Sequence, residues 1–442
     1  MMQTLVLVIL FCAVFYLIFK DKVDRFLGVL YGASATILFG SWYDFFNASQ
    51  VYQSISFETL FLMFGMMLYS DAMAQTGFFK GCAFSMARLA KNDPWLILVL
   101  FSCVTFLLSM FINNLTTIVI ILPITIVMCA GLGMRPIPVV VSEVIASNLG
   151  GASSMVGDFP NMLIASSTSL VFMDFITNLF PACLMGMGIL FAIIYLRKEP
   201  LMLEKPLPNL GEGDKKELLG INDPIKLDRK TNSGIFIFFL MVGLFIYSED
   251  IEVRPSVVAV LGGLLTLAVV ATRKQEVLRN LNYKDIAFFF FLFIMVGGIQ
   301  ASGLLNHVSY MIWMVSDGHN YAQAILTMIA SGVLTIFLNA GPATSLFIPI
   351  AGDFTHYADH GYIWWALSLG VCAGSSAAIT GATSGTIASN YLSEYAKKMG
   401  LEGKEEFKDY NLDFHEFMKV GLPFMGFFLL FSAIYLIRYL YV

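Results

Sequence analysis

The chain has 442 residues, of which 58% are hydrophobic and 13% charged, and its formal net charge is -5. Soluble domains carry about 25% charged residues, and a soluble fold of this length could not bury so much apolar surface. The composition therefore predicts a membrane protein with many spans. No basic patch accompanies the small net charge, so nothing indicates a nucleic-acid partner.

Apolar runs of about 20 residues, the length that crosses a 30 Å hydrocarbon layer, recur along the chain. One stretch, 197–232, is instead rich in proline, glycine and charged residues, and it predicts a cytoplasmic linker. The expected organisation is a first transmembrane repeat (1–196), this linker, and a second repeat (233–442). The ten predicted crossings are 3–19, 26–46, 57–77, 138–171, 173–196, 233–248, 255–272, 286–301, 363–393 and 420–440.

Two further apolar stretches are broken at their centres, 95–130 at Asn113-Asn114 and 322–350 at Asn339. The arms of the first stretch are about 25 Å long as helices, and both flanks carry basic residues. This pattern favours re-entrant hairpins over pairs of full crossings. Non-helical backbone at membrane depth is tolerated only where it is buried or lines a cavity. The tips are therefore candidate ion-binding segments, with Asn113, Asn114, Thr116, Asn339 and Thr344 as the candidate residues.

The two halves match at a nearly constant spacing. Asn339 follows Asn113, and Pro349 follows Pro123, by 226 positions. Five crossings per half are an odd number, so the second copy enters the membrane upside down, as in many secondary transporters. We therefore expect an all-α polytopic membrane protein of two inverted-topology repeats, each with five crossings, a re-entrant hairpin and a broken helix.

The predicted broken helices contain glycine-rich segments, 150–161 in the first half and 374–385 in the second. Glycine permits non-helical backbone whose carbonyl groups can bind ions, and Ser and Thr hydroxyls add neutral ligands. The alternative is close helix packing through small residues. The candidate ion-binding residues of the two segments are Ser153, Ser154, Asp158, Asn161, Ser375, Ser376, Thr380 and Thr383.

Few ionisable residues are expected at membrane depth, where a carboxylate is costly unless it is paired or functional. Asp158 is the candidate carrier of a cation or proton; alternatively it caps the resumed helix. Glu143 is a candidate proton relay, or a cap near the cytoplasmic face. Asp71 is expected at the interface, and Glu58 and Asp285 at helix N-termini, where negative charge is favoured.

No cofactor or metal site is predicted. The six cysteines lie in or beside apolar segments without a CxxC pair, and they are expected to be packing residues. His356 and His360 have the spacing of metal ligands on one helix face. Two ligands alone bind a metal weakly, so a solvated loop is the preferred interpretation. No catalytic constellation is present, and we expect no enzymatic activity.

The tip and the first broken helix resemble a known family. Asn113-Asn114-Leu115-Thr116-Thr117, Ser147–Gly151 and Gly157–Asn161 resemble signatures of the ArsB/NhaD ion transporter superfamily, as do Phe64–Gly77 and Phe417–Pro423. This superfamily includes arsenite permeases, sodium–proton antiporters and pink-eyed-dilution-type proteins. The resemblance implies a site between hairpin tips and broken helices, and alternating access. The tip differs from that of many antiporters, which carry Asp-Asn.

The expected function is secondary active transport of a small inorganic ion, as cation/proton antiport with H⁺ or Na⁺ as coupling ion. One alternative is an efflux permease for arsenite or another anion. Another is a transporter-like protein with an assembly or organelle role, such as magnetosome ion homeostasis. The expected location is the bacterial inner membrane or a membrane derived from it, with the lipid bilayer as partner and a homodimer left open.

The basic residues predict the orientation. With the N-terminus outside, all but Arg254 and Arg438 of the 26 Lys and Arg residues fall on the cytoplasmic side, as the positive-inside rule requires. Both termini should therefore be non-cytoplasmic. Single cysteines introduced into 197–232 should react with a membrane-impermeant thiol reagent only from the cytoplasm, and labelling from outside would refute this orientation.

Overall fold

The computed structural model describes residues 2–20, 22–90, 93–198, 200–203, 228–248, 250–355, 361–401 and 405–440. All regular elements in these ranges are helices, apart from one isolated bridge between Met134 and Met202. The predicted all-α class is confirmed. Most of the predicted linker, together with His356 and His360, lies outside the described residues.

The helices follow the predicted apolar segments closely. Those of the first half are α1 (Met2–Phe19), α2 (Arg25–Trp42), α3 (Ala48–Ser54), α4 (Phe57–Ala74), α5 (Phe78–Leu89), α6 (Pro94–Ser109), α7 (Asn114–Leu132), α8 (Pro136–Ala152), α9 (Phe159–Ser167) and α10 (Phe172–Arg197). Those of the second half are α12 (Arg229–Ile246), α13 (Pro255–Val269), α14 (Lys274–Asn280), α15 (Tyr283–Ala301), α16 (Leu304–Val315), α17 (Asn320–Leu338), α18 (Ala340–Thr355), α19 (Tyr362–Ser375), α20 (Thr383–Lys398), η1 (Glu405–Tyr410), α21 (Phe414–Leu436) and η2 (Ile437–Leu440).

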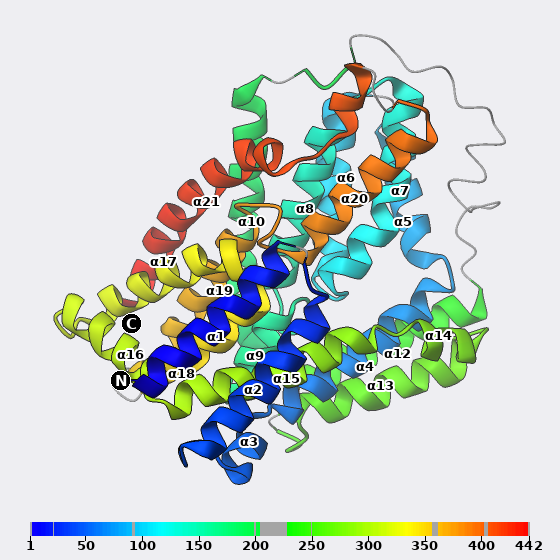
Figure 1. The fold of residues 1–442 in the computed structure, drawn as a ribbon. Helices are drawn as coiled ribbons and strands as arrows, with labels where there is room; N and C mark the ends of the chain where they lie inside the picture. Colours follow the sequence, from blue (N-terminus) through cyan, green and yellow to red (C-terminus); the bar gives the residue numbers. More distant parts are fainter. Residues whose placement is uncertain are drawn as a thin grey trace.

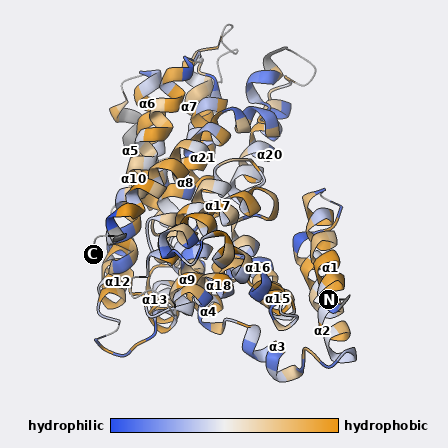
Figure 2. Ribbon diagram, turned by 90° about the vertical axis from the view of Figure 1, so that its left-hand side faces the viewer, coloured by the Kyte–Doolittle hydropathy of each residue, from blue (hydrophilic) through white to orange (hydrophobic). Residues whose placement is uncertain are grey.

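Many of these helices are apolar enough to lie in a bilayer, and Figure 2 shows hydrophobic residues dominating α6 and α8, whereas α3 is largely polar. In the described part of the chain, 6 helices are long and apolar enough to cross, or 7 if α3 and α4 form one bent span. Six shorter apolar helices of 10–17 residues accompany them. The multi-pass architecture is therefore present, and the number of ten crossings stays a prediction.

Both predicted tips and both predicted interruptions separate helices. The first tip lies between α6 and α7, where the Asn113 side chain accepts a hydrogen bond from the Leu115 N–H at 2.8 Å. At the second tip Asn339 has φ +76°, in the region that residues other than glycine rarely adopt. Residues 153–158 separate α8 from α9, and residues 376–382 separate α19 from α20. The chain therefore leaves helical geometry at the predicted places.

The helices of the two halves pack reciprocally. In the first half α6 packs on α8, and in the second α17 packs on α19. Across the halves, α4 contacts α13 while α15 contacts α2, and α7 contacts α20 while α18 contacts α9. Such reciprocity is what two structurally related halves produce. Their inverted orientation relative to a membrane stays a prediction.

The described chain ends lie apart from the end of α10. Figure 1 shows both ends of the chain at the lower left and the end of α10 toward the top. Beyond α10, backbone hydrogen bonds of 2.8 Å join Arg135 N–H to the Leu201 carbonyl and Leu203 N–H to the Gly133 carbonyl. We call the surface formed by the end of α10, residues 133–135 and residues 201–203 the linker face.

Two glycines allow the broken helices to touch their neighbours through backbone atoms. A Cβ built on Gly150 of α8 would lie 2.1 Å from the Phe106 carbonyl oxygen of α6. A Cβ on Gly374 of α19 would lie 2.1 Å from the Gly332 carbonyl oxygen of α17. The small-residue packing considered for these segments is thus present together with the interruptions.

Gly150→Ala and Gly374→Ala should each lower stability by about 1–3 kcal/mol, because backbone cannot move aside as a flexible side chain can. Gly188→Ala in α10 is the matched control, since nothing lies within 4 Å of its Cβ position. Thermal unfolding of the purified protein in detergent measures all three, and equal melting temperatures for the three variants would contradict the backbone contact.

Candidate functional site

The first hairpin tip is joined to the first broken helix by Asn114. This side chain is buried, and its Oδ1 accepts a hydrogen bond from Ser109 Oγ at 2.5 Å. Its Nδ2 lies 3.0 Å from Asp158 Oδ2 and 3.4 Å from Asn148 Oδ1. The Asn114 amide is therefore the group through which a change in the charge of Asp158 would reach the hairpin tip.

Asp158 begins α9, where its Oδ1 accepts a hydrogen bond from the Phe159 N–H at 2.9 Å. The capping role weighed for this residue is thus real, but it occupies only one carboxylate oxygen. The other oxygen faces Asn114. A carboxylate held at the N-terminal end of a short helix also benefits from the positive end of the helix dipole.

Asn148 links the first broken helix to the second. Its Nδ2 donates to the Ser375 carbonyl at 3.0 Å and to Ser376 Oγ at 3.2 Å. The Cys372 thiol donates to the Asn148 carbonyl at 3.6 Å. Asn148 was not among the predicted site residues. The available signal was a primary amide in a mostly apolar helix, directly before Leu149 and two glycines.

Other predicted residues brace the interruption. Asn161 Nδ2 donates to the carbonyl groups of Ala152 and Ser154 at 2.9 and 2.8 Å, and its Oδ1 accepts from Ser368 Oγ at 2.7 Å. Ser154 Oγ donates to the Met110 carbonyl, and Ser153 Oγ donates to a carbonyl of its own helix. These hydrogen bonds satisfy the freed backbone groups, which fixes the shape of the break.

The second tip and second break form a separate polar group. Asn339 Nδ2 lies 3.5 Å from both the Thr380 carbonyl and Thr383 Oγ1. Arg25, at the start of α2, donates to Thr383 Oγ1 at 2.8 Å. The hydroxyl groups of Thr344 and Ser375 bond to carbonyl groups of their own helices. The predicted residues are thus gathered in two groups, linked by Asn148.

A cavity of about 190 Å³ lies beside the first tip. Asp71 and Asp285 face this cavity, although Asp71 was expected only to lie at the interface. Glu58 and Asp285 lie in the first turns of α4 and α15, as predicted. The residues around the cavity are Met67, Asp71, Asn113, Leu115, Thr116, Val119, Asn280, Asn282 and Asp285.

Glu143 lies within α8 and is fully buried. Thr125 of α7 donates a hydrogen bond to its Oε1. A helix rises about 1.5 Å per residue, so Glu143 lies about 10 Å beyond the first residue of α8. The alternative that Glu143 caps this helix is therefore wrong, and the proton-relay interpretation stays a prediction.

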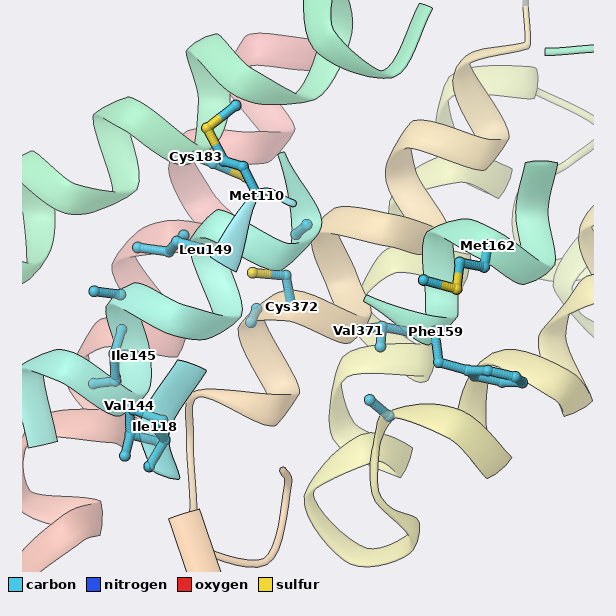
Figure 3. Close-up of a cluster of buried hydrophobic side chains, with 14 of the residues drawn as sticks. Met110, Ile118, Val144, Ile145, Leu149, Phe159, Met162, Cys183, Val371 and Cys372 are labelled. Carbon is cyan, nitrogen blue, oxygen red and sulfur yellow. The ribbon is translucent and has the colours of Figure 1, made fainter. Parts of the chain in front are cut away.

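Apolar side chains surround these polar groups. Figure 3 shows Leu149 of α8, Cys183 of α10 and Cys372 of α19 packed in one region. Phe159 points away from this region, and its ring stacks on Phe289 of α15 with centroids 3.5 Å apart. All six cysteines are free thiols. The polar groups thus lie among apolar side chains that exclude water, and hydrogen bonds are electrostatically stronger in such an environment than in water.

Replacing Asn148 by alanine should lower stability by about 1–3 kcal/mol, because it removes the amide that donates to the Ser375 carbonyl and to Ser376 Oγ. Asn306→Ala, at an exposed position of α16, is the control. Denaturant unfolding monitored by tryptophan fluorescence compares them. Equal stability of the two variants would show that the link between the halves is not needed.

Comparisons with known proteins identify the family. The family described as citrate transporter, CitMHS, matches residues 13–370. The chain is 34% identical over 428 residues to the magnetosome protein MamN of Magnetospirillum gryphiswaldense, covering 96% of this chain and 97% of that protein. It is 24% identical to the P protein of Sus scrofa, covering 96% of this chain and 58% of that protein.

Among solved structures, the fold is similar to the Alcanivorax borkumensis YdaH transporter, with a TM-score of 0.56 and 12% sequence identity over 90% of this chain and 88% of that one. The predicted resemblance to the ArsB/NhaD superfamily is confirmed by the family match and by the P protein. The chain therefore belongs to the CitMHS citrate transporter family, and it is a multi-pass membrane protein of the transporter class.

Proposed function

We propose that this protein exchanges a small cation for protons by alternating access, with Asp158 as the residue that carries the coupling charge. One observation carries the proposal. The Asp158 carboxylate lies where the first hairpin tip meets the broken helix, and it is connected through Asn114 and Asn148 to the second half. A change of charge at Asp158 therefore acts on both halves.

The chemistry of the site suits this exchange. A carboxylate within the membrane is tolerated when it is protonated or when a cation lies beside it. Oxygen atoms of amide and carboxylate groups, such as Asn148 Oδ1 and Asp158 Oδ2, are the ligands that hard cations prefer. Cation binding would then displace the proton from Asp158, and proton return would release the cation.

The residues that line the cavity beside the tip favour binding of a cation over binding of an anion at this end of the site. Two carboxylates, Asp71 and Asp285, face it together with Asn113 and Thr116. Acidic groups in a confined space concentrate cations and repel anions. The cavity is therefore a suitable approach route for a cation to the Asn113-Asn114 tip.

A second candidate, transport of an anion, is favoured by one different observation. Arg25 reaches Thr383, the first residue of α20, and no carboxylate lies in the second break at 376–382. A guanidinium group at a helix N-terminus attracts anions, including carboxylates. The description of the matching family names citrate. Arsenite or another inorganic anion is the corresponding alternative for efflux.

The proposed location is the bacterial inner membrane or a membrane derived from it. Similarity to MamN, which is named as a magnetosome protein, supports an organelle membrane as a specific case. In such a membrane, exchange of protons for a cation would control the composition of the enclosed space.

Asp158→Asn should abolish exchange while leaving folding intact, because asparagine keeps the shape and the helix cap but cannot alternate in charge. Asp44→Asn, at an exposed position, is the matched control. The purified protein in liposomes with an internal pH dye is given Na⁺, Li⁺, divalent cations, arsenite or citrate in turn. The expected result is a cation-driven pH change in wild type and control only.

Three outcomes decide between the candidates. A cation response that survives in Asp158→Asn would move the coupling role away from Asp158. A response to citrate or arsenite that is lost in Arg25→Gln would favour the anion candidate. No response to any of these ions would favour a transporter-like protein with an assembly role.

A further inference from the structure

Three buried polar atoms in one part of the protein have no hydrogen-bond partner among the described residues. They are Glu143 Oε2 and the hydroxyl groups of Tyr395 and Tyr410. These residues are 0%, 3% and 0% exposed. A buried polar atom that gives up its hydrogen bonds to water without replacing them costs free energy. These unpaired atoms therefore suit a small molecule that can both donate and accept hydrogen bonds.

The three residues come from helices that pack together: α20 contacts both α8 and η1, and η1 also contacts α8. Thr125, which bonds to Glu143, and Cys129 are four residues apart and share a face of α7. Helix α20, which carries Tyr395, packs against α7, which carries Thr125 and Cys129. The rings of Tyr395 and Tyr410 stack with centroids 5.8 Å apart.

This group, which we call the tyrosine path, ends at the linker face. Asp409, next to Tyr410, forms an ion pair with Arg135 at 2.7 Å. The side chains of these two residues are 27% and 24% exposed, so the pair is in contact with solvent. Arg135 immediately precedes α8, and Glu143 is about 12 Å further along this helix. The path therefore runs from solvent toward the buried Glu143 carboxylate.

We propose that buried water molecules bridge Glu143, Tyr395 and Tyr410, and that the tyrosine path carries protons between the linker face and Glu143. Water is the fitting occupant because it needs two to four polar partners, which a carboxylate and two phenols supply. This inference rests on the proposed cation/proton exchange, to which it adds Glu143 as a second protonatable group, nearer to the linker face along α8 than Asp158 is.

The proton balance of the route is simple. A proton taken from solvent beside Asp409 enters the hydrogen-bonded chain, and each hydroxyl or water accepts one proton and passes one on. The last transfer converts the Glu143 carboxylate to the neutral acid, and the reverse sequence returns the proton to solvent. Burial raises the pKa of the Tyr410 phenol, so this hydroxyl stays neutral and passes protons along the chain without becoming charged itself.

The test uses infrared spectroscopy of the full-length protein in liposomes. The carboxylic-acid stretching band of Glu143, identified by its loss in Glu143→Gln, is followed after rapid transfer into D₂O over a range of pH. The expected result is fast deuterium exchange in wild type and in Tyr31→Phe, an exposed control. Exchange should be slowed about tenfold or more in Tyr395→Phe and Tyr410→Phe.

A second readout distinguishes hydrated hydroxyl groups from dry ones. If the hydroxyls bond to water, their removal lowers or leaves unchanged the melting temperature; if they are dry and unpaired, phenylalanine raises it. Unchanged deuterium exchange in both variants, a raised melting temperature, or the lack of any Glu143-dependent band at every pH would overturn the proposal. Lack of ion flux with a wild-type pattern of deuterium exchange would instead contradict only the exchange function.

Discussion

A helix that is interrupted inside a bilayer leaves N–H and carbonyl groups that water does not reach, and their satisfaction is the constraint on which this structure depends. Asn161 supplies an amide to two of the freed carbonyl groups of the first break. Ser154 accepts hydrogen bonds from the Val156 and Gly157 N–H groups. In the second half, Thr380 donates to the Ile336 carbonyl of the neighbouring hairpin arm.

Satisfying these groups also determines how the helices pack. Backbone-to-backbone contact at Gly150 and Gly374 brings a hairpin arm against each broken helix. Contact between α2 and α20 is different, because it includes a hydrogen bond from the long side chain of Arg25 to Thr383. Close backbone packing resists relative movement, whereas a flexible polar contact can break and reform. This difference is compatible with one group of helices moving as a unit against the other, as alternating access requires.

Much of this arrangement could be predicted from the sequence, because it depends on local breaks in apolar runs. Asn113 and Asn339 break apolar stretches at matching positions of the two halves, and they predicted both tips. The glycine-rich segments predicted both interruptions. Predicting ion ligands was harder. Ser153, Thr344 and Ser375 have the expected residue types, but their hydroxyl groups bond to carbonyl groups of their own helices.

Long-range contacts could not be predicted from one sequence. Asn148 pairs with residues 227 and 228 positions away, and nothing in its own segment indicates that partner. The tyrosine path likewise joins α7 and α8 to α20 and η1. Glu143 could be recognised as unusual because a carboxylate in a mostly apolar helix is rare. Tyr395 and Tyr410 instead lie between the predicted crossings 363–393 and 420–440, where nothing in the sequence marks them as buried.

The central claim is that cation binding and deprotonation are the same event at Asp158. Proton release by the purified protein on addition of the transported cation, measured in weakly buffered solution with a pH indicator, tests this claim directly. The account predicts release of about one proton per cation bound, which falls as the pH rises and Asp158 is already ionised. Cation binding that releases no proton at any pH would contradict it.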